Sequence, residues 1–285
     1  MRNKNSVKFI AEVSSNHNRD LKRCLRFIKT AAEIGCDAVK FQLFKIDKLF
    51  APEIVKKNKE IQKRKQWELP VAFLPELAQA CKNEGIEFSC TPFYLDAVDE
   101  LLPYVDFYKI ASYELLWDDL LKKCAKTGKP IILSTGMATL KEVEKAVRVL
   151  RDSGCEDMSL LHCVSSYPVP VKDCNLAAIK TLADKFNCPV GWSDHTVKEN
   201  VIWRAVCRWQ ARIVEFHLDL DGEGEEFKSG HCWLPHKIGA VIKDIRESFT
   251  ADGTGLKEPA GIELAEREWR ADTKDGLRPI LKIRK

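Results

Sequence analysis

The sequence lacks any pair of cysteines separated by two residues, although it contains 11 cysteines in 285 residues. Zinc ribbons and thiol redox sites are usually built on such CxxC pairs, so the spacing supports neither class. An odd number of cysteines also cannot all be paired within one chain. Cys36, Cys90, Cys163 and Cys207 each stand alone inside an apolar run, as reduced cysteine does when it packs as a small core residue.

Long apolar runs are also missing. The first apolar segment, residues 7–11, is too short for a secretion signal, and no stretch approaches the length of a membrane span. No basic run is interleaved with aromatic residues, and 46 basic residues nearly balance 42 acidic ones, for a net charge of +4. The basic cluster within residues 56–65 is typical of a solvated helix or loop. We therefore expect a soluble, cytoplasmic protein with neither a nucleic-acid nor a membrane partner.

A glycine-rich dinucleotide loop does not follow the first apolar segment, which disfavours an open, doubly wound sheet. Instead, short apolar segments alternate with amphipathic stretches, and glycines close four of the helical patterns, at residues 21–34, 73–84, 116–127 and 140–153. The eight predicted strands are residues 7–13, 38–44, 86–90, 107–111, 130–134, 158–163, 189–192 and 212–218. Eight such units predict a (β/α)8 TIM barrel.

The barrel is expected to form a single domain over residues 1–249, ending in a helix at 235–249. Residues 250–285 are expected to be a charged tail without a domain of their own. The polar segment 46–69 is too long for a minimal connection between a strand and a helix. We expect it to carry extra structure over the mouth of the barrel.

Polar side chains gather at the carboxyl ends of the predicted strands, where barrel enzymes have their active sites. Two of them, Lys40 and Lys109, would be costly to bury unless an anion meets them. With Ser112, Ser134 and Ser193 they predict a site for a doubly charged small anion, above all phosphate. Two alternatives remain open: both lysines pair with Glu12, Glu114 or Glu215, or one forms a Schiff base as in a pyruvate aldolase.

His195 and His217 follow neighbouring predicted strands. Two neutral imidazoles at adjacent strand ends can hold a divalent ion such as Zn, Mn, Fe or Co with open coordination positions. The alternative is a pair of buried histidines satisfied by backbone carbonyls. A metal site argues against the Schiff base, because metal and imine are alternative ways to activate a carbonyl.

A series of short motifs resembles the sialic acid synthase (N-acetylneuraminate synthase) family. The resemblance runs in order from about residue 9 to residue 219 and is specific as a set. Its motifs are IAE (10–12), NHN (16–18), DAVKFQ (37–42), TPF (91–93), YKIAS (108–112), LSTGM (133–137), LHC (161–163), YP (167–168) and GWSDHT (191–196).

The resemblance implies a metal-dependent condensation of phosphoenolpyruvate with an N-acetylated hexose, such as N-acetylmannosamine, giving a nine-carbon 2-keto sugar acid and phosphate. It implies Mn2+, or else Mg2+ or Co2+, on His195 and His217. Lys40 and Thr91 would meet the phosphoenolpyruvate carboxylate, and Glu114 would move a proton or place a water. The phosphate would be held by Lys109, Ser112, Ser134, Ser165 and Ser193, and the amino sugar faced by Glu12, Gln42, Tyr167 and Asp194. A homodimer is a further expectation.

The sequence departs from the family pattern at three places. Ser14 and Arg19 stand where glycines are common, and the usual Gly-Pro-Asp-His loop after His217 is replaced by residues 221–233. A small C-terminal antifreeze-like domain, which supplies an arginine to the partner's sugar site, is expected to be lacking. We expect the segment 223–233, with Glu225, Lys228 and His231, to complete the site, rather than the tail at 267–278. A barrel that binds a sugar phosphate without turnover is the alternative function.

Overall fold

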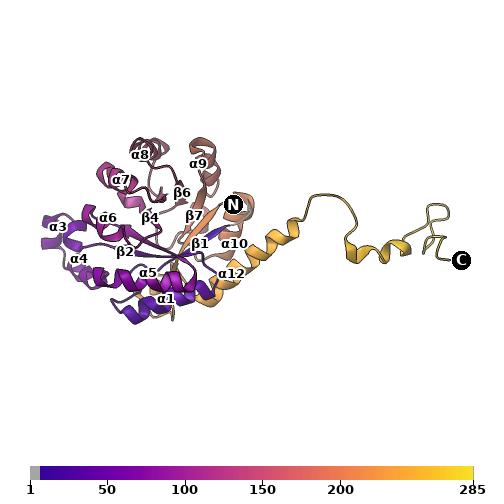
Figure 1. The fold of residues 1–285 in the computed structure, drawn as a ribbon, viewed down its shortest axis with the longest axis horizontal. Helices are drawn as coiled ribbons and strands as arrows, with labels where there is room; N and C mark the ends of the chain where they lie inside the picture. The colour runs from indigo at the N-terminus through magenta and orange to yellow at the C-terminus, as the bar shows by residue number, and fades with distance from the viewer. Residues whose placement is uncertain (1–6, 285) are drawn as a thin grey trace. The chain divides into compact units, whose positions relative to one another are not determined.

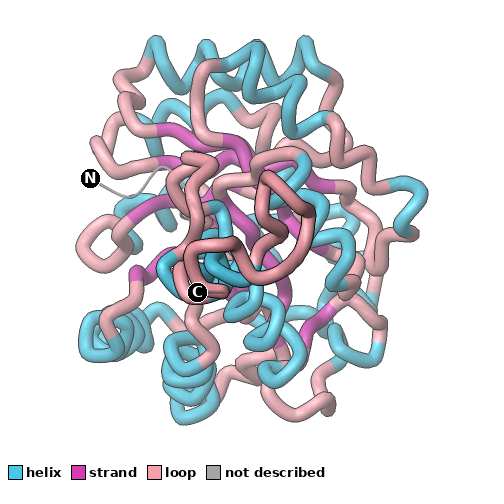
Figure 2. The backbone as a smooth tube through the Cα atoms, turned by 90° about the vertical axis from the view of Figure 1, so that its right-hand side faces the viewer, coloured by secondary structure: helices cyan, strands magenta, loops and turns pink. Residues whose placement is uncertain are grey.

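The computed structural model describes residues 7–284 and has a closed barrel of eight parallel strands. Each strand pairs with the next, and β8 pairs with β1 in the register Lys8↔Ile213 to Glu12↔His217. Figure 2 shows the strands at the centre and the helices around them. The predicted (β/α)8 barrel is confirmed. Its strands are β1 (Lys8–Glu12), β2 (Ala38–Leu43), β3 (Glu87–Pro92), β4 (Phe107–Ile110), β5 (Ile131–Ser134), β6 (Met158–Cys163), β7 (Val190–Asp194) and β8 (Ile213–Leu218).

Helices follow the strands in sequence and surround them (Figure 1). Left-handed glycines end the predicted helices, for example Gly35 at φ +88° and Gly85 at φ +72°. Three helices that the apolar pattern did not single out complete the ring: α6, α9 and α10, the last continuing into a π-helix at Arg204–Arg208. The main helices are α1 (Leu21–Glu33), α5 (Leu74–Glu84), α6 (Leu95–Leu101), α7 (Asp118–Ala125), α8 (Leu140–Asp152), α9 (Ala178–Phe186), α10 (Glu199–Trp203) and α12 (Pro235–Ser248).

The barrel interior is divided into an apolar and a polar layer. The apolar layer holds buried side chains from six strands: Ile10, Ala38, Phe107, Ile132, Leu161 and Ile213. Further along the same strands, towards their carboxyl ends, the buried side chains become charged, as Glu12, Lys40 and Glu215 show. The apolar layer closes the barrel below the polar residues, so these residues face the carboxyl-terminal mouth.

The insertion after β2 is helical, as expected of extra structure. It forms α2 (Ile46–Leu49), α3 (Pro52–Lys57), α4 (Lys59–Lys63) and a 3-10 turn, η1 (Arg64–Trp67). Glu68 accepts a hydrogen bond from the Ile46 backbone at 2.7 Å, which closes the insertion on itself. Arg19 donates to the Lys65 carbonyl at 3.2 Å, so the insertion contacts the loop that leaves β1.

The chain divides into two compact units, residues 1–246 and 247–285. The second contains three 3-10 turns, η6 (Phe249–Asp252), η7 (Gly261–Glu263) and η8 (Glu266–Trp269). Within it, Asp272 accepts from the Leu281 backbone at 2.7 Å, and Arg284 pairs with Asp275. In the described part of the chain, no helix has both the length and the apolar character needed to cross a membrane.

Candidate active site

The register of the barrel brings residues far apart in sequence into one layer. Glu12 on β1 lies beside Lys40 on β2 and beside His217 on β8. Gln42 lies beside Thr91, and Ser193 beside Glu215. Successive side chains of a strand alternate between its faces, so a shift of one residue in any pairing would remove a residue from this group.

These side chains line a small cavity at the carboxyl ends of the strands. A larger hollow lies at the amino ends, among Lys8, Asp37 and Glu87, the end of a barrel that serves stability. Of the predicted site residues, all but Glu114, Asp194 and Ser165 line the cavity. Its lining is Glu12, Lys40, Gln42, Thr91, Phe93, Lys109, Ala111, Ser112, Tyr113, Ser134, Cys163, Tyr167, Ser193, His195, Glu215 and His217.

Both buried lysines have carboxylate partners. Lys40 pairs with Glu12 on the neighbouring strand and donates to Thr91 Oγ1 at 3.2 Å. Lys109 on β4 reaches Glu215 on β8 across the barrel, with 3.1 Å between Nζ and Oε1. Internal pairing, the alternative left open by the sequence, is therefore present in this structure. An ammonium carries three donors, so Lys109 keeps donors for an anion in the cavity.

The buried charged groups that line the cavity shift one another's pKa values. Burial acts to raise the pKa of Glu215, but the charges of Lys109 and Lys40 outweigh it and hold that pKa at about 2. Burial lowers the pKa of Lys40 to about 8, against the opposing effect of Glu215. Two ammonium groups and two carboxylates thus face one another within a small buried volume.

Unsatisfied polar atoms mark the same region. In the described part of the chain, Ser134 Oγ, Glu114 Oε2 and Glu215 Oε2 are buried without a hydrogen-bond partner. Ser112 Oγ accepts from the Gly136 backbone at 2.9 Å, and a side chain at Gly136 would collide with the hydroxyls of Ser112 and Ser165. Buried polar atoms of this kind call for a partner that the protein does not provide.

Glu114 lies just outside the cavity lining, in the 3-10 turn η3 (Ser112–Glu114) that follows β4. Burial raises its pKa to about 7, and the charge of Lys109 only partly opposes that rise. A carboxyl group with this pKa can give or take a proton at neutral pH.

The two predicted metal-binding histidines lie together, with ring centroids 5.4 Å apart. His195 Nδ1 lies 2.8 Å from the Val164 carbonyl, and His217 Nδ1 lies 2.9 Å from Glu226 Oε2. A carbonyl and a carboxylate can only accept, so both Nδ1 atoms carry protons and both Nε2 atoms carry lone pairs. Burial lowers both pKa values, that of His195 to about 3, so both rings are neutral. This is the state in which imidazole binds a metal.

Tyr167 covers the histidines from the loop after β6. Its ring lies 4.2 Å from that of His195 and 6.0 Å from that of His217, centroid to centroid. The ring of His231 also lies near that of Tyr167, 5.0 Å away between centroids. The aromatic ring therefore shields one side of the imidazole pair.

Comparison with known proteins agrees with this arrangement. The NeuB family model matches residues 27–257. The chain belongs to the NeuB family. It is 36% identical to the N,N'-diacetyllegionaminic acid synthase of Campylobacter jejuni, covering 89% of this chain and 80% of that one. It is 40% identical to an uncharacterized protein of Methanocaldococcus jannaschii, over 89% and 74% of the two chains.

A solved structure has the same fold. The N-acetylneuraminic acid synthetase of Leptospira borgpetersenii, crystallised with citrate, superposes with a TM-score of 0.82 at 32% identity, over 95% of this chain and 94% of that one. The named relatives are synthases, and this NeuB-family chain is an enzyme of that class.

The loop after β8 is one of the places where this NeuB-family chain departs from the expected pattern. Of the residues expected to complete the site, Glu225 and Lys228 are exposed, whereas His231 is buried beside His217. The carboxylate that reaches His217 belongs to Glu226, which the sequence did not single out. A short ninth strand, β9 (Cys232–Trp233), pairs in parallel with β8 and returns the chain to the barrel.

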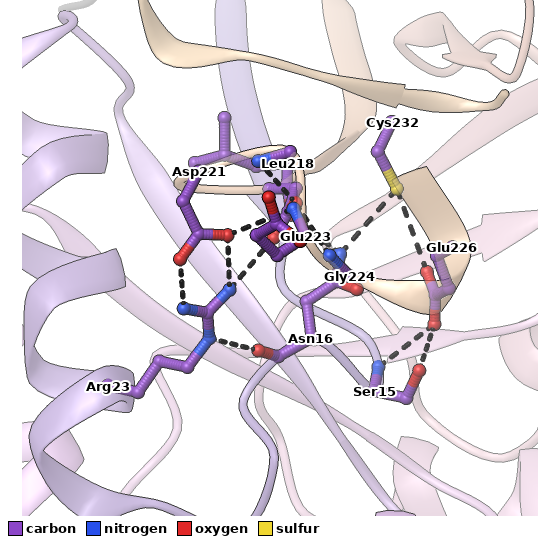
Figure 3. Close-up of polar contacts among 11 residues, drawn as sticks. Ser15, Asn16, Arg23, Leu218, Asp221, Glu223, Gly224, Glu226 and Cys232 are labelled. Atoms are coloured by element: carbon purple, nitrogen blue, oxygen red, sulfur yellow. Dashed lines mark hydrogen bonds and ion pairs between the residues drawn. The ribbon is translucent and has the colours of Figure 1, made fainter. Parts of the chain in front are cut away.

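Contacts to the β1–α1 loop and to helix α1 hold this segment in place (Figure 3). Arg23 donates to Asp219 at 3.0 Å and to Asp221 at 2.6 Å. Glu226 Oε1 accepts from both the backbone and the hydroxyl of Ser15. Gly224 approaches Asn16 so closely that a Cβ there would lie 2.6 Å from its Oδ1.

Asp194 is placed differently from the prediction that it faces the sugar. It is fully buried, and its carboxylate accepts from Trp192 Nε1, Trp233 Nε1, the Thr196 hydroxyl, and the backbone of Thr196 and Val197. With both oxygens occupied in this way, Asp194 fixes the turn that carries His195 and does not line the cavity. Ser165 also lies outside the lining, although its hydroxyl is near Gly136.

Proposed function

We propose that this enzyme condenses phosphoenolpyruvate with an N-acetylated hexose, giving a nine-carbon 2-keto sugar acid and phosphate. The observation that carries the proposal is the cavity in which two buried lysines and two neutral imidazoles meet. The names of three relatives support a nine-carbon sugar acid as the class of product. These relatives are named as synthases of diacetyllegionaminic acid, pseudaminic acid and N-acetylneuraminate 9-phosphate. In the reaction, C3 of the enolpyruvate bonds to the aldehyde carbon, water adds at C2, and phosphate departs.

In this proposal Lys40 and Thr91 bind the carboxylate of phosphoenolpyruvate. Lys109 binds its phosphate with the hydroxyls of Ser112, Ser134, Ser165 and Ser193. The support is the unpartnered Ser134 hydroxyl and the donors that Lys109 retains beyond its pair with Glu215. Charge-assisted hydrogen bonds of this kind are among the strongest that a site can offer to an anion.

A divalent ion fits His195 and His217. Each ring donates its Nδ1 proton to an acceptor, and each is neutral, so each offers an Nε2 lone pair. We take Mn2+ as the first candidate, with Mg2+ and Co2+ as the others. Lewis-acid polarisation of the sugar aldehyde is the chemistry that such an ion supplies. Phosphoenolpyruvate C3 is a weak nucleophile, which makes that activation necessary.

Glu114 is proposed to take the proton from the water that adds at C2. Its pKa of about 7 supports this role, because a base is most effective when its pKa is near the working pH. Glu12, Gln42 and Tyr167 are proposed to contact the acceptor sugar. Each lines the cavity, and Tyr167 reaches its rim with about two-fifths of its side chain exposed.

Phosphate release from phosphoenolpyruvate, measured with a panel of N-acetylated hexoses, tests this function. We expect release with at least one acceptor, loss of release after metal removal, and recovery with Mn2+. Full turnover in the metal-free protein, or no release with any acceptor, would contradict the proposal. Reductive trapping of pyruvate on Lys40 or Lys109 would identify an imine aldolase instead.

A further inference from the structure

Four potential metal ligands converge at His217, which also lines the cavity. They are His217, Glu226, His231 and Cys232, and one ligand atom from each lies within 4.8 Å of the other three. Glu226 Oε2 is the common neighbour: His217 Nδ1 lies 2.9 Å away, His231 Nε2 3.5 Å and Cys232 Sγ 3.9 Å.

This convergence leaves too many donors for one acceptor. A carboxylate oxygen has about two lone-pair directions, yet three groups that can donate face Glu226 Oε2. Glu226 Oε1 is already occupied by the backbone and hydroxyl of Ser15. With a cation among them, two nitrogens, one sulfur and one oxygen would all use lone pairs instead of competing as donors.

The charge of the group also favours a cation. The ion pairs of Glu226 in the described structure are with His217 and His231. A largely buried carboxylate is costly unless a cation meets it, and a metal ion held by these four residues would be such a cation.

We propose that His217, Glu226, His231 and Cys232 form a binding site for a divalent ion of borderline softness, such as Zn2+, Fe2+ or Co2+. Four donors with one thiolate and two imidazoles match the tetrahedral preference of Zn2+. The thiolate sets this site apart from the His195–His217 pair, which has no sulfur. The site goes beyond the condensation proposed above and requires neither of its substrates.

The backbone around the site fixes its ligands. Cys232 lies opposite His217 in the β8–β9 register, so two ligands come from one ladder position. Asn16 donates its amide to the Leu218 carbonyl and lies 3.6 Å from Cys232 Sγ, which ties β8 and β9 to the β1–α1 loop (Figure 3). A site on strands and a tethered loop holds its ligands more accurately than a free loop would.

The two metal sites share one imidazole, and a neutral imidazole has a single lone pair. With its proton on Nδ1, His217 offers Nε2 towards the His195 side; with its proton on Nε2, it offers Nδ1 to the cluster of four. An ion in the cluster therefore takes His217 from the catalytic pair. We expect one tightly bound ion per chain.

Titration of the metal-free protein with Co2+ tests the site without any substrate. We expect a thiolate-to-cobalt charge-transfer absorption band, which Cys232→Ser abolishes. Cys163→Ser is the matched control, because Cys163 is a buried cysteine that lines the cavity itself. His231→Gln should weaken Co2+ binding by about tenfold or more while the band persists. His195→Gln should leave the band in place.

Several results would overturn the proposal. A band that survives Cys232→Ser, or that disappears in Cys163→Ser, would show that a cysteine other than Cys232 supplies the thiolate. Loss of the band in His195→Gln would mean that one centre includes His195. If Cys232→Ser does not fold, unchanged Co2+ affinity in His231→Gln would count against the site. Failure of the condensation alone would leave these binding results unaffected, so the two proposals can be told apart.

Discussion

The floor of the cavity and the loop after β8 hold buried charges in different ways. On the floor, Lys40 pairs with Glu12 and Lys109 with Glu215, and all four side chains extend from barrel strands. In the loop, Glu226 contacts His217, and Ser15 and Arg23 hold the segment through hydrogen bonds to Glu226 and Asp221. The floor is positioned by backbone register, and the loop by side-chain contacts.

This difference has an energetic consequence. Removing one partner on the floor leaves a charge that the rigid barrel cannot expose to water. In the loop, the same change can be relieved by movement of the segment. Variants on the floor should therefore cost more stability, and variants in the loop should act more strongly on ligand binding.

Lys109→Met should have the largest effect. It leaves Glu215 buried and unpaired inside the barrel, so we expect the free energy of unfolding to fall by about 3–5 kcal/mol. Denaturant unfolding measures this change. Lys180→Met, which breaks an exposed pair with Asp184, is the control and should cost less than about 1 kcal/mol. Adding Glu215→Leu to Lys109→Met should recover much of the loss.

An unfolding free energy in Lys109→Met equal to that of the parent would show that Glu215 finds another partner. The contrast between floor and loop would then lose its main support.

Glu114→Gln should change how stability depends on pH. The pKa of Glu114 is about 7 in the folded protein and 4.5 in the reference state. The folded state therefore holds the proton more tightly, and this group's stabilising contribution, full below pH 4.5, is lost as the pH rises to about 7. At 1.36 kcal/mol per pKa unit the loss is about 3 kcal/mol. Unfolding measured from pH 4.5 to 7 should show this slope in the parent and lack it in Glu114→Gln.

The comparison of the two pH profiles removes the contribution of other groups. Parallel profiles would mean that Glu114 titrates near its ordinary pKa and is not poised for proton transfer. For Glu215 the dependence of stability on pH has the opposite sign. Its pKa is lowered to about 2 in the folded protein, so the ionised group stabilises the fold above pH 4.5, and this contribution is lost as the pH falls towards 2.

Arg23→Gln tests the loop side of the comparison. Arg23 neutralises Asp219, which is completely buried, and Asp221, which is partly exposed. We expect a loss of about 2 kcal/mol, below that of Lys109→Met because the loop can move, together with weaker binding of Co2+. Arg246→Gln, in a more exposed pair with Asp37, should cost under about 1 kcal/mol. A loss in Arg23→Gln as large as that in Lys109→Met would show the loop to be as rigid as the barrel.

The floor could be predicted from the sequence, and the loop could not. Apolar runs and closing glycines give the eight strands, and the strands then bring Lys40, Lys109, His195 and His217 together without knowledge of any side-chain contact. Helix α6 was harder to recognise because its seven residues give little periodicity.

The partners of Asp194 and Glu226 depend on the path of a loop. Asp194 is held by Trp233, 39 residues away, and Glu226 by Ser15, 211 residues away. The family resemblance implied that Asp194 faces the sugar, whereas in the structure both of its carboxylate oxygens accept hydrogen bonds from the protein itself. For Glu226, the only signal in the sequence was its place among acidic residues soon after His217.

Truncation after Ala265 should have the smallest effect. Residues 266–285 include Trp269 and Arg270, which the sequence offered as an alternative cover for the sugar site. The loop after β8 already brings Glu226 and His231 to His217, so the site should not need the tail. Within the second unit, Arg284 pairs with Asp275 and Ile280 donates to the Glu268 carbonyl, so this segment has bonding partners of its own. We expect Co2+ affinity and the KM values for phosphoenolpyruvate and the sugar to remain unchanged. A higher KM for the sugar alone, with metal and phosphoenolpyruvate binding intact, would instead assign the cover to the tail.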